Sequence, residues 1–257
     1  MQSVVSLAKV AGQGIMSVYQ GNITTRLKDD ESPVTEADLA AHNIILAGLE
    51  QLSPGVPIIS EESDAIPFQL RRKWNRYWLV DPLDGTREFI KRNGEFTVNI
   101  ALIEHHNPVL GVVYAPALDL LYFAVKGEGA YRQQGSLLPH AIKSRQIPER
   151  ITVAGSRSHT SGRMQEFLRR IGPHELISMG SSLKICLVAE GRADVYPRLG
   201  PTSEWDTAAG QCVLEEAGGQ LVGMDGRSFR YNTRESLLNS EFFATGSKSR
   251  NWDDYIK

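Results

Sequence analysis

The first apolar residues of the chain recur at helical spacing. They lie three or four positions apart, at Val4, Leu7, Ala8, Ala11, Ile15, Val18 and Tyr19. Residues that recur in this way share one face of a helix, so the pattern predicts an amphipathic helix over residues 3–20. Gly21 and Asn22 end this helix, and the polar stretch over residues 24–31 is predicted to be a mobile loop.

A second helix is predicted over residues 36–51, with four apolar side chains facing inward: Leu39, Ile44, Ile45 and Leu49. Thr35 and Asp38 have the spacing of a capping box, in which each side chain binds a backbone N–H group at the start of the helix. Asp38 therefore has a structural interpretation as a helix cap, beside any functional one.

Strands predominate between residues 56 and 133. A short buried strand over 56–60 ends at Glu61, and an apolar run over 77–80 ends at Asp81. The residues between them, 64–73, are predicted to be a surface connection. Further on, the pattern has a period of two, which predicts neighbouring antiparallel strands over 96–104, 109–115, 120–126 and 130–133.

Strands and helices alternate after a polar, turn-rich stretch over residues 139–149. Strands are predicted over 151–154, 176–177, 194–196, 220–222 and 242–244, and helices over 161–171, 180–190 and 204–217. Such alternation indicates an α/β layer packed beside the antiparallel half. The predicted fold class is α/β, with an N-terminal α+β domain over 1–148 and a C-terminal α/β domain over 149–257.

The composition narrows the classes of function. The chain has 257 residues and a net charge of −2, which does not suggest a nucleic-acid-binding protein. It has no apolar stretch of about 18 residues that could span a membrane, and no signal peptide pattern. The two isolated cysteines, Cys186 and Cys212, suit a reducing cytoplasm. We therefore expect a cytoplasmic location. Peripheral attachment at the cytoplasmic face of the inner membrane and the oligomeric state stay open.

The stretch Asp81-Pro82-Leu83-Asp84-Gly85-Thr86 is the strongest candidate for a site. Two carboxylates lie three positions apart around a turn, and Gly85 lets a ligand approach the backbone. Thr86 is predicted to cap a short helix over residues 87–92, whose first N–H groups would attract phosphate. Because carboxylates attract hard cations, the stretch suits metal-assisted phosphoryl transfer. The alternative is an ordinary Asp-Gly turn after a strand.

Other carboxylates have similar positions in the predicted elements. Glu61 follows a strand, and Asp206 lies in the first turn of a helix. Strand ends and helix starts are where α/β proteins collect binding groups, although spacing alone leaves open whether these acids meet. The six histidines form no His-x-x-x-His pair, which disfavours zinc, whereas carboxylates and a backbone carbonyl suit magnesium. The phosphate loop of many kinases and the dinucleotide-binding fingerprint are both missing from the sequence.

Four motifs together resemble those of the inositol monophosphatase superfamily. They are Pro33-Val34-Thr35-x-x-Asp38, Ser60-Glu61-Glu62, Asp81-Pro82-Leu83-Asp84-Gly85-Thr86 and Trp205-Asp206-x-x-Ala209-Gly210. The resemblance spans residues 33–210 and implies a layered αβαβα sandwich. It also implies a magnesium-dependent, lithium-sensitive phosphomonoesterase that binds two to three Mg²⁺ ions per site.

Within that superfamily the chain resembles the 3′(2′),5′-bisphosphate nucleotidases. The resemblance is close over residues 77–115 and continues in the stretches that begin Gly180-Ser181-Ser182-Leu183-Lys184 and Tyr196-Pro197-Arg198. It implies hydrolysis of the 3′-phosphate of adenosine 3′,5′-bisphosphate to AMP and phosphate, extending to the sulfated relative of that nucleotide. The alternatives are an inositol or sugar phosphatase with the same metal centre, and a nucleotide- or metal-sensing module without turnover.

The resemblance also implies a role for particular residues. Glu61, Asp81 and the Leu83 carbonyl would hold one Mg²⁺, and Asp81, Asp84 and Asp206 a second, with a weaker third ion beside Glu61. Asp38 and Thr86 would orient and deprotonate the attacking water, so that with Glu61 they form the catalytic set. The substrate would be bordered by Glu61, Leu83, Asp84, Gly85, Thr86 and Asp206, with phosphate gripped by the N–H groups of Gly85 and Thr86. Lys184 and Arg198 are candidates for the second phosphate, and residues 156–159 for the adenine.

Overall fold

The computed structural model describes residues 1–21, 23–27, 33–157, 162–246 and 252–255. Its α-helices are α1 (Gln2–Tyr19), α2 (Glu36–Leu52), α3 (Phe68–Arg71), α4 (Thr86–Ile90), α5 (Gly162–Ile171), α6 (Leu183–Ala189) and α7 (Glu204–Glu216). Two short 3₁₀ turns are η1 (Pro116–Leu118) and η2 (Trp252–Tyr255). The helices predicted near residues 3–20, 36–51, 161–171 and 204–217 are therefore confirmed.

The strands form two large sheets and one small hairpin. The seven-stranded sheet has the order β3 (Ile58–Ser60), β4 (Arg76–Asp84), β5 (Thr97–Glu104), β6 (Asn107–Ala115), β7 (Leu120–Val125), β8 (Gly129–Gln134) and β9 (His140–Ile142). The five-stranded sheet has the order β11 (His174–Met179), β10 (Ile151–Ser156), β12 (Val195–Arg198), β14 (Phe242–Thr245) and β13 (Gln220–Gly223). The hairpin pairs β1 (Thr25–Leu27) with β2 (Pro33–Thr35).

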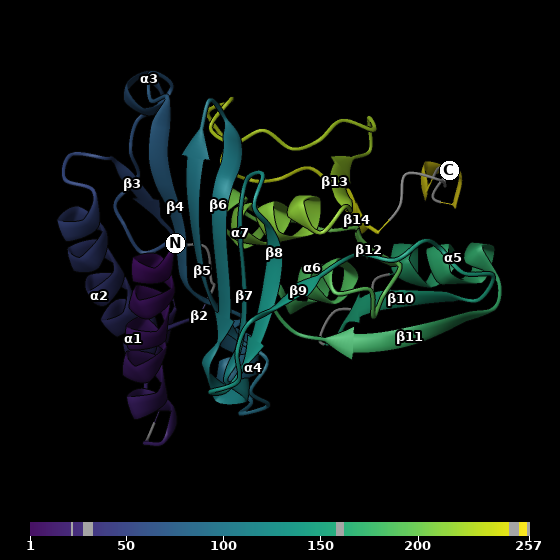
Figure 1. Ribbon diagram of the computed structural model, residues 1–257, viewed down its shortest axis with the longest axis horizontal. Helices are drawn as coiled ribbons and strands as arrows, with labels where there is room; N and C mark the ends of the chain where they lie inside the picture. The colour runs from purple at the N-terminus through teal and green to yellow at the C-terminus, as the bar shows by residue number, and fades with distance from the viewer. Residues whose placement is uncertain (22, 28–32, 158–161, 247–251, 256–257) are drawn as a thin grey trace.

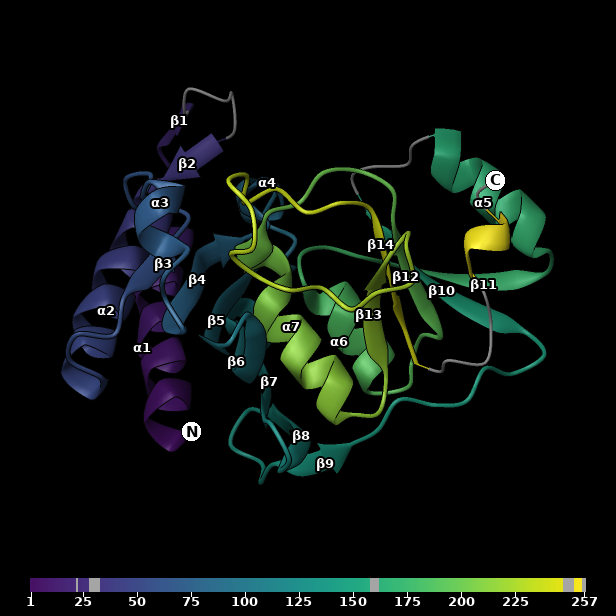
Figure 2. The same cartoon turned by 90° about the horizontal axis from the view of Figure 1, so that it is seen from above.

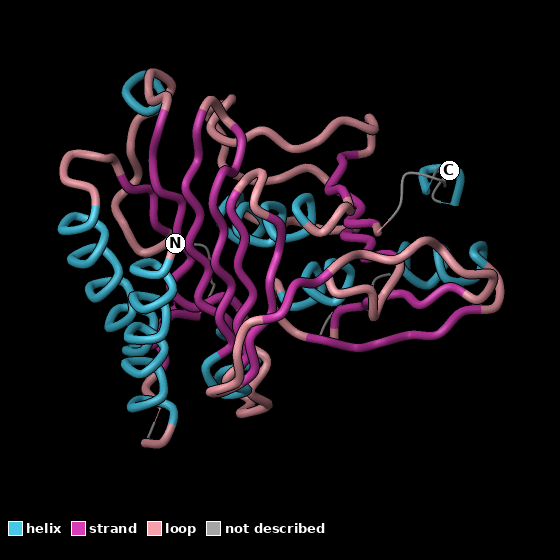
Figure 3. The backbone as a smooth tube through the Cα atoms, in the orientation of Figure 1, coloured by secondary structure: helices cyan, strands magenta, loops and turns pink. Residues whose placement is uncertain are grey.

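These elements stack as alternating layers of helices and sheets. Figures 1 and 2 show α1 and α2 on one face of the seven-stranded sheet, and α6 and α7 between that sheet and the five-stranded one. Helix α5 covers the outer face of the five-stranded sheet (Figure 3 separates helix from strand by colour). The layer order is αβαβα, so the predicted fold class and sandwich architecture are confirmed.

The outer layer of α1 and α2 packs through small side chains. Helix α2 buries Ala37, Ala41, Ile45 and Leu49, a row with a spacing of four that faces α1 and the sheet. Leu39, predicted to face inward, is 44% exposed, because this row lies on a different face of the helix. Leu7 of α1 packs against Gly48, where an added Cβ would lie 2.4 Å from a Leu7 methyl carbon. The helices can approach this closely because small residues line the contact.

The middle layer joins the two halves of the chain in one apolar core. Ala209 and Cys212 of α7 share a core cluster with Ala101 of the seven-stranded sheet and Phe242 of the five-stranded one. Helix α7 lies so close to β6 that a Cβ on Gly111 would come within 2.4 Å of the Ala209 carbonyl oxygen. This contact brings the start of α7, a distant part of the sequence, beside the end of β4.

Several local predictions were wrong where tertiary pairing outweighed a polar sequence. The predicted loop over 24–31 contains β1, which pairs with β2, and residues 28–32 lie outside the described ones. The turn-rich stretch over 139–149 contains β9, an edge strand paired with β8. The connection predicted over 64–73 is mostly exposed, as expected, and includes the short helix α3. The helix predicted from residue 180 begins at Leu183.

Two further features concern the whole chain. The division into domains over 1–148 and 149–257 stays a prediction. We propose it because each part contains one of the two large sheets, although the sheets share a core. In the part of the chain that the structure describes, no helix has both the length and the apolar character needed to cross a membrane.

The contact at Gly111 predicts a specific loss of stability. We expect Gly111→Ala to destabilise the fold by about 1–3 kcal/mol, since the added methyl overpacks the interface between β6 and α7. For a chain of this size each kcal/mol lowers the melting temperature by about 2–4 °C. Gly162→Ala at the start of α5 is the control, because its Cβ would meet open space. Thermal melts in which both variants match the parent would contradict this account of the packing.

Candidate functional site

The end of β4 presents the Asp81–Thr86 stretch in an irregular conformation. The register between β4 and β5 shifts between Asp81 and Asp84, and the Leu83 N–H donates to Asp81 Oδ1 at 3.0 Å. Gly85 then adopts φ 90°, in the left-handed region, and an added Cβ would lie 3.1 Å from the Glu95 carbonyl oxygen. Gly85, and not Thr86 as predicted, is the N-cap residue of α4, because only the glycine takes this conformation easily.

Three carboxylates from distant parts of the chain meet at this point. Single oxygens of Asp81, Asp84 and Asp206 all lie within 4.8 Å of one another. Asp206 is held there by the first turn of α7, where its Oδ2 accepts from the Ser203 N–H at 2.8 Å in a capping box. The structure therefore brings together the two acids of the strand end and the acid of the helix start.

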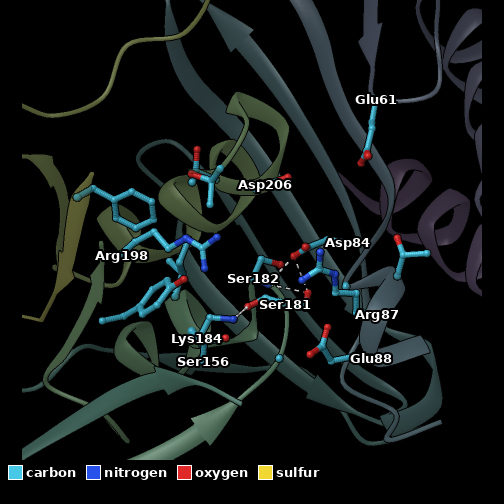
Figure 4. Close-up of a pocket in the computed structure, with 18 of the residues that line it drawn as sticks. Glu61, Asp84, Arg87, Glu88, Ser156, Ser181, Ser182, Lys184, Arg198 and Asp206 are labelled. Atoms are coloured by element: carbon cyan, nitrogen blue, oxygen red, sulfur yellow. Dashed lines mark hydrogen bonds between the residues drawn. The ribbon is translucent and has the colours of Figure 1, made fainter. Parts of the chain in front are cut away.

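Glu61 approaches the same place from β3. Its N–H donates to the Val80 carbonyl at 3.1 Å, which fixes the backbone beside β4. The side chain lines one pocket together with Asp84 and Asp206, and Figure 4 shows its carboxylate pointing into that pocket. Glu61 lies outside the group of three carboxylates within 4.8 Å.

The surroundings of Asp81 and Asp206 oppose the ionisation of these two acids in the absence of a cation. Burial, together with the charges of Glu61, Asp84 and Asp206, raises the pKa of Asp81 well above its usual range. Burial, and then the charges of Asp84 and Glu61, raise the pKa of Asp206 to about 8. Divalent cations would reverse both effects, since they favour the charged carboxylates. The donor set consists of carboxylate oxygens, which are the ligands that magnesium prefers, so the residues present fit that ion.

Asp38 and Thr86 face each other beside the cluster. The Thr35 hydroxyl and N–H donate to Asp38 Oδ2 at 2.6 and 2.7 Å, while Thr86 Oγ1 lies 3.4 Å from Asp38 Oδ1. The capping box predicted for Thr35 and Asp38 is therefore confirmed, and it leaves the second oxygen directed at Thr86. Burial raises the pKa of Asp38, against the hydrogen bonds from Thr35 that lower it.

A pocket of about 200 Å³ opens next to the carboxylates. Its lining includes Gly85, Thr86 and Tyr196. Figure 4 shows Lys184 and Arg198 on one side of the pocket and Asp84 on another. The Lys184 ammonium donates to the Ser181 carbonyl at 2.5 Å and lies 5.3 Å from the centre of the Tyr196 ring. Burial lowers its pKa to about 8.

Arg198 lies at the edge of the same pocket and donates through Nη2 to the Pro201 carbonyl at 2.6 Å. Its Nε is buried and has no hydrogen-bond partner among the described residues. Ser156, one of the residues predicted to flank an adenine, lines the pocket, and Arg157 instead pairs with Glu95 at 2.7 Å. Residues 158 and 159 lie outside the described ones.

Ser181 and Ser182 contact Asp84, and the sequence analysis does not predict this contact. Ser181 Oγ and the Ser182 N–H each donate to Asp84 Oδ2 at 2.6 Å. The only local signal is the Gly-Ser-Ser run before a helix, which does not indicate a contact with Asp84. No local pattern links residue 84 to residue 181, so the pairing could not be seen before the fold was known.

Comparison with known proteins gives a consistent family. The model of the inositol monophosphatase family matches residues 1–253. The 3′(2′),5′-bisphosphate nucleotidase CysQ of Salmonella typhimurium is 50% identical over 247 residues, which cover 95% of this chain and 99% of that protein. The nucleotidase CysQ of Escherichia coli K12 is 49% identical over 244 residues, covering 94% and 98%.

Solved structures resemble the chain over nearly its whole length. The crystal structure of CysQ from Bacteroides thetaiotaomicron, a bacterial member of the inositol monophosphatase family, matches with a TM-score of 0.84 at 41% identity, covering 95% of this chain and 96% of that one. The extragenic suppressor protein suhB from Bartonella henselae matches with a TM-score of 0.82 at 28% identity, covering 100% and 98%.

The raised pKa values predict how stability depends on pH when divalent cations are removed. An unfolded aspartate has a pKa of about 4, and that of folded Asp206 is about 8. The folded protein therefore binds more protons over this interval, so the stabilisation present below pH 4 is lost as the pH rises towards 8. We expect the melting temperature in EDTA to fall by several degrees between pH 5.5 and 8, and added Mg²⁺ to restore it at pH 8.

Asp206→Asn is the matched variant for this measurement, because the amide keeps the shape of the side chain without its proton equilibrium. Its melting temperature should depend less on pH than that of the parent. An equal pH dependence in parent and variant, or an effect of Mg²⁺ that is larger at pH 5.5 than at pH 8, would contradict the electrostatic account.

Proposed function

The chain belongs to the inositol monophosphatase family, and we propose that it is a 3′(2′),5′-bisphosphate nucleotidase, which removes the 3′-phosphate from adenosine 3′,5′-bisphosphate to give AMP and phosphate. The supporting observation is the cluster of Asp81, Asp84 and Asp206 at the mouth of a pocket that also contains Lys184 and Arg198. The nucleotidases CysQ that match at 49–50% identity over at least 98% of their length support the same activity.

We propose Mg²⁺ as the cofactor of this metal-dependent family. Glu61, Asp81 and the Leu83 carbonyl would hold one ion, and Asp81, Asp84 and Asp206 a second, with Asp81 shared and a weaker third site beside Glu61. The raised pKa values of Asp81 and Asp206 support this assignment, since acids forced together at a buried point favour a counter-cation. Bound Mg²⁺ would supply Lewis acidity, which makes water a better nucleophile and stabilises the leaving oxygen.

The proton of the attacking water would pass to Asp38 through Thr86. Thr86 Oγ1 can accept a proton from the water while its own hydroxyl donates towards Asp38 Oδ1, 3.4 Å away. Thr35 occupies Asp38 Oδ2 with two hydrogen bonds, so Oδ1 is the oxygen available for this transfer. Burial raises the pKa of Asp38 and so makes the carboxylate a stronger base than an exposed aspartate.

The remaining contacts would bind the two phosphates of the substrate. The N–H groups of Gly85 and Thr86 at the start of α4 would hold the phosphate that is removed. Lys184 and Arg198 would hold the second phosphate, since both cations line the pocket beside Tyr196. An inositol monophosphate has no second phosphate group to use this pair of cations, which favours the nucleotide over that ester.

Two finer assignments accompany this function. The sulfated relative of the nucleotide would be a second substrate, because it presents the same 3′-phosphate. A cytoplasmic location is proposed because Cys186 and Cys212 are free, buried thiols.

Substrate preference is the first test. We expect faster release of phosphate from adenosine 3′,5′-bisphosphate than from inositol 1-phosphate at equal concentrations, because only the nucleotide offers a second phosphate to Lys184 and Arg198. Lys184→Met should narrow this difference in rate, because it should raise the KM for the nucleotide more than the KM for the inositol ester. Faster turnover of the inositol ester by the parent would instead identify an inositol phosphatase with the same metal centre.

The acidic cluster is tested by charge removal. Asp84→Asn and Asp206→Asn should each lower kcat by several orders of magnitude, because each removes a charge from a proposed metal ligand. Asp225→Asn is the matched control, at an exposed position outside the pocket. Phosphate release, followed with and without lithium at limiting Mg²⁺, is the measurement. If the parent released no phosphate and the cluster variants bound nucleotide as well as it does, the chain would be a binding module.

A further inference from the structure

Three polar side chains project from one face of the start of β5 and of the residues just before it. Glu95, Thr97 and Asn99 alternate along the chain, and alternate residues of an extended segment point to the same side. Thr97 and Asn99 are almost completely buried, with 0% and 1% of their surface exposed. Buried polar groups are retained at a cost, so their partners indicate what they do.

All three side chains bind one turn, Gly180–Ser182, which comes from the second half of the chain. Glu95 Oε2 accepts from the Gly180 N–H at 2.8 Å. Thr97 Oγ1 lies 2.5 Å from Ser181 Oγ and 2.9 Å from Ser182 Oγ, and Asn99 Oδ1 accepts from Ser182 Oγ at 2.9 Å. Each residue of the turn is therefore held by at least one member of this polar face.

The Gly180–Ser182 turn also binds the side chain of Asp84. Ser181 Oγ and the Ser182 N–H both donate to Asp84 Oδ2 at 2.6 Å, and Figure 4 shows the two serines directed at this carboxylate. Its other oxygen, Oδ1, accepts no hydrogen bond from the residues that the structure describes and so is free to serve as a ligand. The two serine contacts fix the rotation of the carboxylate group.

The conformation of the turn depends on its contacts. Ser181 has φ 55°, in the left-handed region that side chains other than glycine rarely adopt, so surrounding interactions must hold it there. Gly180 lies so close to the residues before β5 that an added Cβ would come within 2.6 Å of the Glu95 carbonyl oxygen. The contacts with the polar face therefore determine the conformation of the turn.

We propose that Glu95, Thr97 and Asn99 are positioning residues, which orient Asp84 for cation binding by holding the Gly180–Ser182 turn in its left-handed conformation. The inference rests on the proposed metal-dependent function and adds three residues to it. In the pairing of β4 with β5, Asn99 lies opposite Asp81 and Thr97 lies opposite Asp84. The polar face is therefore next to two members of the carboxylate cluster.

The arrangement also couples the metal ligand to the substrate pocket. Lys184 lies two residues after the turn and donates to the Ser181 carbonyl at 2.5 Å. A shift of the turn would therefore move the ammonium and the Asp84 carboxylate together. Groups that hold a ligand in place typically contribute about 10–100-fold to metal affinity.

Cation affinity without substrate is the direct test. Mn²⁺ titrated into the full-length protein and followed by electron paramagnetic resonance measures binding independently of turnover. We expect Thr97→Val to weaken Mn²⁺ binding about tenfold or more, because valine keeps the shape of threonine but removes the hydroxyl. Thr97→Ser restores the hydroxyl and should bind Mn²⁺ like the parent.

Two further variants keep the test decisive. Ser182→Ala removes the contacts to Thr97 and Asn99 but keeps the N–H that binds Asp84, so it should weaken binding even if Thr97→Val does not fold. Thr152→Val is the matched control, a buried threonine of the other sheet whose hydroxyl accepts from Arg145. It should lower the melting temperature without changing Mn²⁺ affinity.

The possible outcomes separate this inference from the proposed function. Weaker binding in Thr97→Val and Ser182→Ala, with rescue by Thr97→Ser, supports the positioning role. Unchanged Mn²⁺ affinity in both variants, in a parent that binds Mn²⁺ and hydrolyses the nucleotide, would overturn the positioning role and leave the function standing. A parent that binds no Mn²⁺ at millimolar concentration would overturn both.

Discussion

Mutual repulsion between clustered carboxylates is the constraint on which the candidate site depends. Asp81, Asp84 and Asp206 are brought within 4.8 Å of one another at a point where burial raises the pKa of Asp81 and of Asp206. Such a cluster costs free energy unless a proton or a cation compensates it. Packing of the rest of the fold must therefore offset this repulsion and keep the acids close together. In the proposed metal site, divalent cations would balance this repulsion, and the relief of repulsion would contribute to their affinity.

The layered architecture keeps these acids close together. Helix α7 lies between the two sheets, against β6 at Gly111, and it carries Asp206 on its first turn. Strand β4, in the same sheet as β6 and buried along most of its length, carries Asp81 and Asp84 at its end. The apolar core that α7 shares with both sheets fixes the distance between these two elements. The packing that stabilises the core therefore also sets the geometry of the site.

Hydrogen bonds then set the orientation of the side chains that packing has brought close. Thr35 fixes Asp38 through Oδ2 and leaves Oδ1 for Thr86, while Ser181 and Ser182 fix Asp84 through Oδ2. In each case one carboxylate oxygen accepts the supporting hydrogen bonds, and the other is left for the proposed proton transfer or metal binding. The supporting donors belong to the buried scaffold, so the site is organised before any ligand arrives.

The sequence by itself determined the features that depend on neighbours along the chain. The capping box of Thr35 and Asp38, the helices that carry Asp38 and Asp206 and the strand that ends at Asp81 follow from local periodicity and spacing, and the family motifs pointed to the acids. Only the tertiary structure decided that Asp206 meets Asp81 and Asp84, and that Ser181 and Ser182 bind Asp84 from 97 and 98 positions away. Short pairings such as β1 and β9 were missed for the same reason, since their stability comes from a partner strand and not from their own residues. Contacts of this range are set by how layers pack, and no local pattern encodes them.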